Sequence, residues 1–308
     1  MNFQYKIKPI DIGKHLVTFL SEKYTYYSQE EWKNQIIEGN ILVNENKADI
    51  NFILNLNDEI SFSIDDFIEP EVDKNFSIVY EDEFLFAVNK PGNLPVHPAG
   101  RYQKNNLTSL LAESNFNPDE IFIVNRLDRE TSGIVLFGKS SEAASKLGKL
   151  FETGKIGKTY ISYVEGLFPE KLSAKGYLSK DENSKIRKRK KFSYEKDYTS
   201  LWAVNTDFAL LETKNGISKI FAFPHTGKIH QIRATLYSIG YPVVGDKIYG
   251  YDENIFLQFI ETGFCESKFS ISRQALHAHT LEFIQPFTGK MVVIRAEEPP
   301  DMKGIFEE

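Results

Sequence analysis

The sequence of 308 residues contains a single cysteine, Cys265. One thiol excludes a disulfide framework and every zinc site built on several cysteines. No stretch approaches the roughly 18 consecutive apolar residues of a membrane-spanning helix. Residues 1–13 show neither a long apolar run nor a small-residue cleavage site. We therefore expect a cytoplasmic protein that has no contact with a membrane.

Positive charge is also in deficit, with 37 Lys and Arg against 43 Asp and Glu and a net charge of -6. This balance argues against a protein that coats nucleic acid through its total charge. Hydrophobic residues make up 41% and aromatic residues 13% of the chain, which is enough for a sizeable core and excludes a disordered chain. The length is about twice that of a typical domain and predicts two domains.

The positive charges are concentrated in one segment. Residues 185–191, the basic segment, carry six positive charges in seven positions. Such a run is typical of a solvated loop, which either has no partner or contacts a polyanion. The candidates for contact with phosphate are Lys185, Arg187, Lys188, Arg189, Lys190 and Lys191.

A domain boundary is predicted near residue 70, where the acidic residues 65–71 include a proline. Before it, Ser28 and Glu31 fit a capping box at the start of a helix, and Gly39 can end that helix in a left-handed turn. Short apolar runs at residues 41–43 and up to Phe62 predict small strands. We therefore expect one domain at residues 1–70, with helices followed by a small sheet, and a second at residues 71–308.

The first domain resembles the S4-type RNA-binding domain. The likeness rests on residues 13–16, Ser28, residues 37–44 and residues 56–60. The chain departs from the family's pattern at residues 15–17, which are His-Leu-Val instead of Arg-Leu-Asp, and at Glu45, where a glycine is usual. The resemblance implies an RNA-binding role, and the alternative is a packing domain without a ligand.

Residues 133–140 match the pattern of a nucleotide-binding P-loop. A P-loop binds phosphate through backbone N–H groups that no strand has used. Residues 134–137 are instead Ile, Val, Leu and Phe, which predict a buried strand, and residues 141–151 predict a helix after it. We therefore expect the match to be fortuitous, which leaves a nucleotide hydrolase with little support.

His277 and His279 are two positions apart in another predicted strand, which places both side chains on one face of it. His225 and His230 lie upstream. Zinc would require further ligands in an open, shaped site. Histidines within a short apolar stretch are more often packed in a sheet. We expect structural histidines, no bound metal and no other cofactor.

Residues 125–133 precede the strand predicted at residues 134–137. A loop anchored by a rigid strand is a common position for catalytic groups. Asp128 lies between two arginines, whose charge favours the ionised carboxylate, and such a group can act as nucleophile or general base. From these residues alone, a surface turn held by a salt bridge explains the pattern better.

The same residues, however, resemble the Arg-Leu-Asp-x-x-Thr-Ser-Gly motif of the RluA family of RNA pseudouridine synthases. Further matches follow in the family's order at residues 88–98, 158–166, 226–233, 240–250 and 275–289. The resemblance spans about residues 75–295, and an S4-like domain in front is a common arrangement in that family. Asn125 stands where the family commonly has His, a change that we expect to alter a supporting contact.

The resemblance implies that the protein isomerises specific uridines in structured RNA to pseudouridine without a cofactor. It makes Asp128 the catalytic carboxylate, Tyr160 the tyrosine beside the uracil, and Arg233 the partner of Asp128. The target uridine must leave its stack to reach such a site. The candidates for contact with the flipped nucleotide are Asn125, Arg126 and Arg129.

The implied fold is α+β, with a central, largely antiparallel sheet and an active-site cleft. Ribosomal RNA is the expected substrate, with transfer RNA as the alternative, and we expect a monomer. The competing function is that of a non-catalytic RNA-binding or ribosome-assembly protein on the same fold. The presence of Asp128, Tyr160 and Arg233 together argues against it, because a protein without catalysis has no chemical reason to keep all three.

Overall fold

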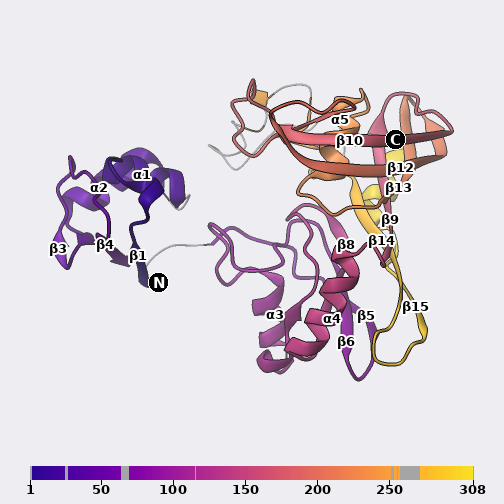
Figure 1. Ribbon diagram of the computed structural model, residues 1–308, viewed down its shortest axis with the longest axis horizontal. Coiled ribbons are helices and arrows are strands. Elements are labelled where there is room, and N and C mark those ends of the chain that lie inside the picture. Colours follow the sequence, from indigo (N-terminus) through magenta and orange to yellow (C-terminus); the bar gives the residue numbers. More distant parts are fainter. Residues whose placement is uncertain are drawn as a thin grey trace. The chain divides into compact units, whose positions relative to one another are not determined.

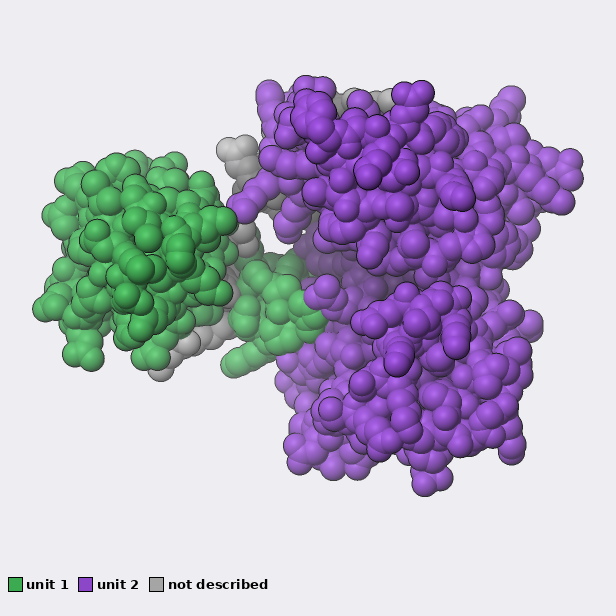
Figure 2. Space-filling view, viewed as in Figure 1, with its two compact units in different colours: residues 1–71, 97–105 green, residues 72–96, 106–308 purple. Residues whose placement is uncertain are grey.

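A computed structural model describes residues 2–24, 27–63, 69–114, 116–250, 253–254, 256 and 271–307. The chain divides into two compact units, one of residues 1–71 with 97–105 and one of residues 72–96 with 106–308 (Figure 2). Cys265 and residues 65–68 of the expected linker lie outside the described residues.

The smaller unit combines two α-helices with a four-stranded antiparallel sheet in the order β1-β4-β2-β3 (Figure 1). Its elements are β1 (Asn2–Lys6), the 3-10 helix η1 (Pro9–Asp11), α1 (Leu16–Lys23), α2 (Gln29–Ile37), β2 (Ile41–Val43), β3 (Asn46–Lys47) and β4 (Glu59–Ser63). The expected helices and small strands are present, and β1 is an additional strand. Its alternating aromatic side chains account for it, because Phe3 stacks on Phe62 and Tyr5 contacts Phe19.

Helix α2 begins and ends as the sequence predicts. The Ser28 hydroxyl accepts a hydrogen bond from the Glu31 N–H at 3.2 Å, and the Glu31 carboxylate accepts one from the Ser28 N–H at 2.6 Å. Gly39 follows the helix with φ of +78°. The fully buried Trp32 packs edge-on against Phe62, with ring centroids 5.2 Å apart, and anchors the helix on the sheet.

The larger unit is built on an 11-stranded sheet. Nine strands follow one another in the order β11-β10-β12-β13-β9-β14-β8-β6-β5, while β15 pairs with β14 and β7 pairs with β8. The strands are β5 (Ser77–Glu81), β6 (Leu85–Lys90), β7 (Phe122–Ile123), β8 (Ser132–Gly138), β9 (Gly157–Glu165), β10 (Lys171–Lys180), β11 (Lys190–Ser193), β12 (Ser200–Lys214), β13 (Ile217–Pro224), β14 (Leu276–Ile284) and β15 (Met291–Arg295). Among the described strands only β14 and β8 run parallel, so the expected largely antiparallel sheet is confirmed.

Short helices cover this sheet. They are α3 (Leu107–Glu113), η2 (Pro118–Glu120), α4 (Ser141–Glu152), α5 (Gln231–Ser238), α7 (Pro300–Lys303) and η3 (Gly304–Phe306). Helix α4 packs on β8, and α5 packs on β10, β11 and β13. The strand and the helix predicted around residues 134–151 are thus confirmed. Because β8 pairs with β6 from Gly133 to Gly138, no phosphate-binding loop forms there.

Strand β14 lies between β9 and β8 and joins the two parts of the sheet. Its Ala278 pairs with Tyr160 of β9 on one side and with Gly133 of β8 on the other. Gly133 has φ of +108°, and a Cβ atom there would lie 2.2 Å from the Ala278 carbonyl oxygen. Only glycine therefore allows β8 to approach β14 so closely. This pairing brings the loop before β8 near the tyrosine of β9.

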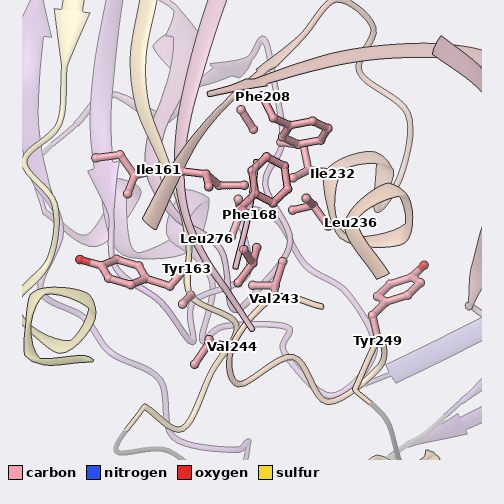
Figure 3. Packing of buried hydrophobic residues seen from close by; sticks show 14 of the residues in the cluster. Ile161, Tyr163, Phe168, Phe208, Ile232, Leu236, Val243, Val244, Tyr249 and Leu276 are labelled. Atoms are coloured by element: carbon pink, nitrogen blue, oxygen red, sulfur yellow. The ribbon is translucent and has the colours of Figure 1, made fainter. Parts of the chain in front are cut away.

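Helix α5 is held by its apolar side chains. Ile232 and Leu236, one helical turn apart, belong to the buried cluster that contains Phe168 and Phe208 (Figure 3). The helix is buried from Gln231 through Leu236. A helix enclosed in this way holds the polar side chains it carries in fixed positions.

Candidate active site

The loop between β7 and β8 carries Asp128 and is fastened to the strand that follows it. Asn125 Oδ1 accepts a hydrogen bond from the Leu136 N–H at 2.7 Å, and Asn125 Nδ2 donates to the Ile134 carbonyl oxygen at 3.3 Å. These hydrogen bonds engage the Asn125 amide with the backbone of β8. The structure therefore does not favour the expected contact between Asn125 and a nucleotide. Asn125 instead fixes the entry of the loop, in line with the supporting contact expected at this position.

Two buried basic side chains hold the other end of the loop. Lys90 Nζ donates to the Arg129 carbonyl oxygen at 3.1 Å, and Arg273 Nη1 donates to the Glu130 carbonyl oxygen at 3.1 Å. Hydrogen bonds to backbone carbonyls are strengthened in the low dielectric of a buried site. The backbone on the C-terminal side of Asp128 is therefore fixed.

Arg233 connects Asp128 to a second carboxylate. Its Nη1 donates to Asp128 Oδ2 at 2.7 Å, while its Nε and Nη2 donate to the two oxygens of Asp246 at 2.6 and 2.8 Å. Asp246 Oδ1 also accepts the N–H groups of Ile248 and Tyr249, at 2.9 and 3.0 Å. The planar guanidinium can bridge both carboxylates because its donors form a rigid fork.

The charges in this cluster stabilise one another. Burial by itself would raise the pKa of Asp128, but the charge of Arg233 and hydrogen bonds from Arg233 and Gln274 hold it below the usual value. Burial likewise opposes the ionisation of Asp246, and Arg233 lowers the pKa of that carboxyl as well. Both carboxylates are therefore ionised at neutral pH. The two anions outweigh burial at Arg233 and raise its pKa, so the arginine stays charged.

Tyr160 belongs to the same site. Burial raises the pKa of its hydroxyl to about 12, and the negative charge of Asp128 contributes in the same direction. The side chain therefore keeps its proton at neutral pH. The structure thus brings together Asp128, Tyr160 and Arg233, the three residues predicted to carry the chemistry.

Three further residues complete the site, and sequence reasoning assigned them no role. His230 Nε2 lies 3.9 Å from Asp128 Oδ1, and His230 Nδ1 lies 3.0 Å from the hydroxyl of the buried Tyr249. Asp246 is the second partner of Arg233. All three lie within the matched residues 226–233 and 240–250, so the available signal was their position in those motifs.

The two predicted arginines of the loop differ in their surroundings. Arg126 is exposed, whereas Arg129 is half-buried and its Nη2 donates to Glu130 at 2.9 Å. Glu130 also accepts a hydrogen bond from Lys247 Nζ at 2.9 Å. The positive charge of Arg129 is therefore partly balanced within the protein.

The basic segment is only partly a solvated loop. Its residues 185–189 precede β11, and Lys190 and Lys191 are the first residues of that strand. The exposed cations are Lys185, Arg187, Lys188 and Lys191. Lys190 is half-buried, with its Nζ 5.5 Å from the centroid of the Trp202 ring.

Arg189 departs from the expectation of a phosphate-contacting side chain. Only 4% of the residue is exposed, and its Nη1 donates to Glu253 at 2.8 Å. Its Nε lies 3.4 Å from Asp181, and its guanidinium packs over the ring of Tyr237. Tertiary packing thus encloses Arg189 between carboxylates and an aromatic ring, which disfavours the expected contact with phosphate.

His277 has the structural role expected of it. It is fully buried, its Nδ1 lies 2.9 Å from the Ser132 hydroxyl, and its Nε2 lies 3.1 Å from the Ala296 carbonyl oxygen. His279 contacts the same carbonyl at 2.7 Å. In the part of the chain that the structure describes, no group of three or more His, Cys, Asp and Glu could hold a metal ion. No described helix has the length and apolar character needed to cross a membrane.

The fold and the site together define a class of protein: an α+β enzyme with a paired, ionised carboxylate next to a protonated tyrosine. The sequence pattern of the RNA pseudouridylate synthase family matches residues 85–238, which is half of the chain. The chain belongs to this family, as its motifs predicted, and it is an RNA pseudouridine synthase.

Relatives of known name support this membership. Ribosomal large subunit pseudouridine synthase D of Buchnera aphidicola subsp. Schizaphis graminum is 30% identical, over 96% of this chain and 93% of its own. Ribosomal large subunit pseudouridine synthase D of Zymomonas mobilis is 29% identical, over 96% of this chain and 94% of its own. tRNA pseudouridine synthase C of Vibrio vulnificus is 32% identical, over 75% of this chain and 94% of its own.

Solved structures show the same fold. Human RNA Pseudouridylate Synthase Domain Containing 1 aligns with a TM-score of 0.59 and 22% identity, over 76% of this chain and 89% of its own. Human RNA Pseudouridylate Synthase Domain Containing 4 aligns with a TM-score of 0.58 and 19% identity, over 75% of this chain and 92% of its own. The α+β pseudouridine synthase fold expected from the sequence is confirmed.

Proposed function

We propose that Asp128 is the catalytic carboxylate with which this enzyme isomerises uridine in structured RNA. The observation that carries the proposal is the hydrogen bond of 2.7 Å from Arg233 Nη1 to Asp128 Oδ2, in a loop held by Asn125 and Lys90. The carboxylate side chain retains 30% of its exposure, so it is both fixed and accessible. A fixed, ionised and accessible carboxylate is what the reaction needs beside the ribose.

The reaction breaks the bond between C1′ and N1 of uridine and forms a bond between C1′ and C5. The hydrogen on C5 leaves as a proton, N1 gains a proton, and no electrons are exchanged with another molecule. Because Arg233 occupies Oδ2, we assign the step at the ribose to Oδ1 of Asp128. This oxygen serves as nucleophile at C1′ or as base on the sugar, and both roles require the same placement.

We assign Tyr160 to the uracil side of the site. Its pKa of about 12 keeps the hydroxyl protonated, so Tyr160 can donate a hydrogen bond to the detached base. It can then relay the late proton transfer by passing its own hydrogen to N1 and accepting the hydrogen of C5, which regenerates the hydroxyl. We assign Arg233 to holding Asp128 ionised and oriented through its second partner, Asp246.

The proposed RNA contacts lie around this site. A uridine reaches Asp128 only when it is flipped out of its stack, and Arg126 and Arg129 lie next to Asp128 in the same loop. The exposed cations of the basic segment supply contacts to the phosphate backbone. We propose in addition that residues 1–70 form an S4-like RNA-binding domain. Lys14 there pairs with Asp11 and Glu22, and Lys33 pairs with Glu30, which leaves that domain a smaller electrostatic share of the binding.

Ribosomal RNA is the substrate that the comparisons favour. The ribosomal relative from Buchnera aligns over 96% of this chain and therefore includes most of the smaller unit, whereas the tRNA relative from Vibrio aligns over 75%. We propose that the protein acts in the cytoplasm on large-subunit ribosomal RNA. We also propose that it acts as a monomer.

Release of tritium tests the proposed function. Ribosomal RNA and transfer RNA, each labelled with tritium at C5 of uridine and free of pseudouridine, are incubated separately with the wild-type protein and with Asp128→Asn. We expect release from ribosomal RNA with the wild type, and a rate at least about a hundredfold lower with Asp128→Asn at unchanged RNA affinity. Release from transfer RNA alone would replace the proposed substrate. No release from either pool would favour the non-catalytic RNA-binding protein.

A further inference from the structure

His230 occupies a position that its neighbours define closely. It precedes α5 with φ of +55°, a left-handed conformation that costs a residue other than glycine free energy. Only 7% of its side chain is exposed. A buried side chain on a strained backbone, next to a reactive carboxylate, is a candidate for a role in the reaction.

The hydrogen bonds of Tyr249 determine which nitrogen of His230 carries hydrogen. The Lys190 N–H lies 3.0 Å from the Tyr249 hydroxyl oxygen, and a backbone N–H can only donate. The hydrogen of this buried hydroxyl therefore needs an acceptor of its own, because an unmade hydrogen bond in a buried site is costly. The described partner that can accept it is His230 Nδ1, at 3.0 Å.

An Nδ1 atom that accepts a hydrogen bond carries no hydrogen. In the neutral ring the hydrogen must then be on Nε2, the nitrogen that lies 3.9 Å from Asp128 Oδ1. The ring is neutral because burial, together with the nearby charge of Arg233, lowers the pKa of His230 to about 4. His230 thus presents an N–H group to the oxygen of Asp128 that Arg233 does not bind.

We propose that His230 is a positioning residue for Asp128. The Nε2–H group of His230 directs Oδ1 of Asp128 toward the ribose, and the hydroxyl of Tyr249 orients the His230 ring. The inference rests on the proposed role of Asp128. A separation of 3.9 Å is too long for a hydrogen bond, so Oδ1 keeps its reactivity while the N–H group faces it. Such contacts commonly shorten when the substrate is bound.

The same contacts connect the site to the basic segment. Lys190 belongs to that segment, and its backbone N–H is the group that orients Tyr249. Its side chain is not involved in this contact. A change of the Lys190 side chain alone therefore keeps the hydrogen bond that orients Tyr249.

Nitrogen NMR of histidine side chains tests the proposal without reference to activity. Protein labelled with ¹⁵N-histidine is compared with His230→Gln, which assigns the His230 signals among the six histidines of the chain. We expect the wild type to show the Nε2–H tautomer for His230, and Tyr249→Phe to lose that preference. A wild-type ring with its hydrogen on Nδ1 would overturn the proposal.

Kinetics with a matched pair of variants test the consequence. His230→Leu removes the donor, whereas His230→Gln keeps an N–H group, and both place an unbranched Cβ on the same strained backbone. We expect His230→Leu to lower the single-turnover rate about tenfold to a hundredfold at unchanged RNA affinity, and His230→Gln to restore most of it. Equal losses in the two variants, or a wild-type rate in His230→Leu, would show that the donor has no such role.

Lys190→Gln is the control for the basic segment. It keeps the backbone N–H and changes only the side chain that lies over Trp202, so it should leave the tautomer of His230 unchanged. A changed tautomer in this variant would contradict the role of the backbone N–H. Absence of tritium release from the wild type would count against the proposed function itself. In that case the tautomer measurement still decides the arrangement of His230, because it requires no substrate.

Discussion

Nη1 of Arg233 lies 2.7 Å from Oδ2 of Asp128, although 105 residues separate the two in the chain. Asp128 belongs to a loop before β8, and Arg233 to a helix that packs on β10, β11 and β13. The pair therefore joins two parts of the larger unit across its sheet. The pair forms only when the loop before β8 and helix α5 are both held in place.

Replacing Arg233 by Lys should change the pH dependence of the reaction. In the wild type the pKa of Asp128 lies below its usual value of 3.8, so the active carboxylate is lost only as the pH falls through that lowered value. A lysine ammonium cannot bridge two carboxylates as the guanidinium fork does. The pKa of Asp128 should then rise, and the acidic limb of the rate should move to higher pH. Single-turnover rates from about pH 3 to about pH 8 measure this limb, which in the wild type should begin only below the usual value of 3.8.

Tyr160→Phe is the control for that shift. It should lower the rate, because it removes the hydroxyl that we assign to the uracil side, and it should leave the acidic limb where it is. An Arg233→Lys profile that coincides with the wild type would show that Arg233 does not set the pKa of Asp128.

Asp246→Asn should destabilise the protein and slow the reaction. The substitution removes the negative charge of a fully buried carboxylate that accepts two hydrogen bonds from Arg233. Breaking a buried ion pair costs about 3 to 5 kcal/mol, and Arg233 would also lose the partner that orients it. Chemical denaturation measures the stability. Glu142→Gln is the control, because Glu142 and its partner Lys146 are 69% and 46% exposed, and loss of this surface pair should cost about 1 kcal/mol or less. Similar costs for the two variants would contradict the structure.

Removing the exposed charge of the basic segment should weaken RNA binding in a salt-dependent way. The variant changes Lys185, Arg187, Lys188 and Lys191 to Gln. Each lost phosphate contact should reduce the slope of log affinity against log salt concentration by about 0.7 to 0.9. Fluorescence anisotropy at several salt concentrations measures the slope, and saturating RNA should restore the rate. A double change of the exposed Lys149 and Lys155 to Gln, which lie outside the segment, should leave the slope unchanged.

Arg189→Gln should behave differently from its neighbours in the basic segment. Because its guanidinium is buried and pairs with Glu253 and Asp181, the variant should lose stability rather than salt-dependent affinity. Thermal unfolding and the salt series, measured on one preparation, separate the two effects. A variant that unfolds like the wild type but binds RNA with a smaller salt slope would restore Arg189 to the RNA-contacting set.

Gly133→Ala should prevent the larger unit from folding stably. The new methyl group would lie 2.2 Å from the Ala278 carbonyl oxygen on a backbone with φ of +108°, and strand backbones cannot move apart without breaking the sheet. Gly148→Ala in α4 is the control, since open space surrounds that position and alanine favours a helix by about 1 kcal/mol. Unfolding by heat or denaturant should shift in opposite directions for the two variants, and a tolerated Gly133→Ala would refute the close approach.

Local rules were sufficient to predict several elements of the fold. The capping box of Ser28 and Glu31 depends on residues three positions apart, and the apolar run of β8 needs no distant partner to be recognised as a strand. Strand β1 is different, because its stability comes from packing of Phe3 and Tyr5 on residues far along the chain. No local pattern indicates such contacts.

The residues of the site also divide into those that the sequence predicts and those that only the fold determines. The motifs predicted that Asp128, Tyr160 and Arg233 act together, but the sequence does not say which acidic residue completes the coordination of Arg233. Asp246 has that position because the turn after it donates two backbone N–H groups to its carboxylate. Arg189 is the converse case, since its sequence neighbours are exposed cations and only the fold encloses it.

Strand β14 determines when the active site can exist during synthesis of the chain. Residues 166–275 separate it from β9, and β9 and β8 have no pairing with each other. On the ribosome, β8 and β9 therefore each keep one unpaired edge until β14 has been synthesised. Unpaired strand edges favour aggregation. The arrival of β14 thus brings together the residues that we propose to be catalytic, although the strand itself carries none of them.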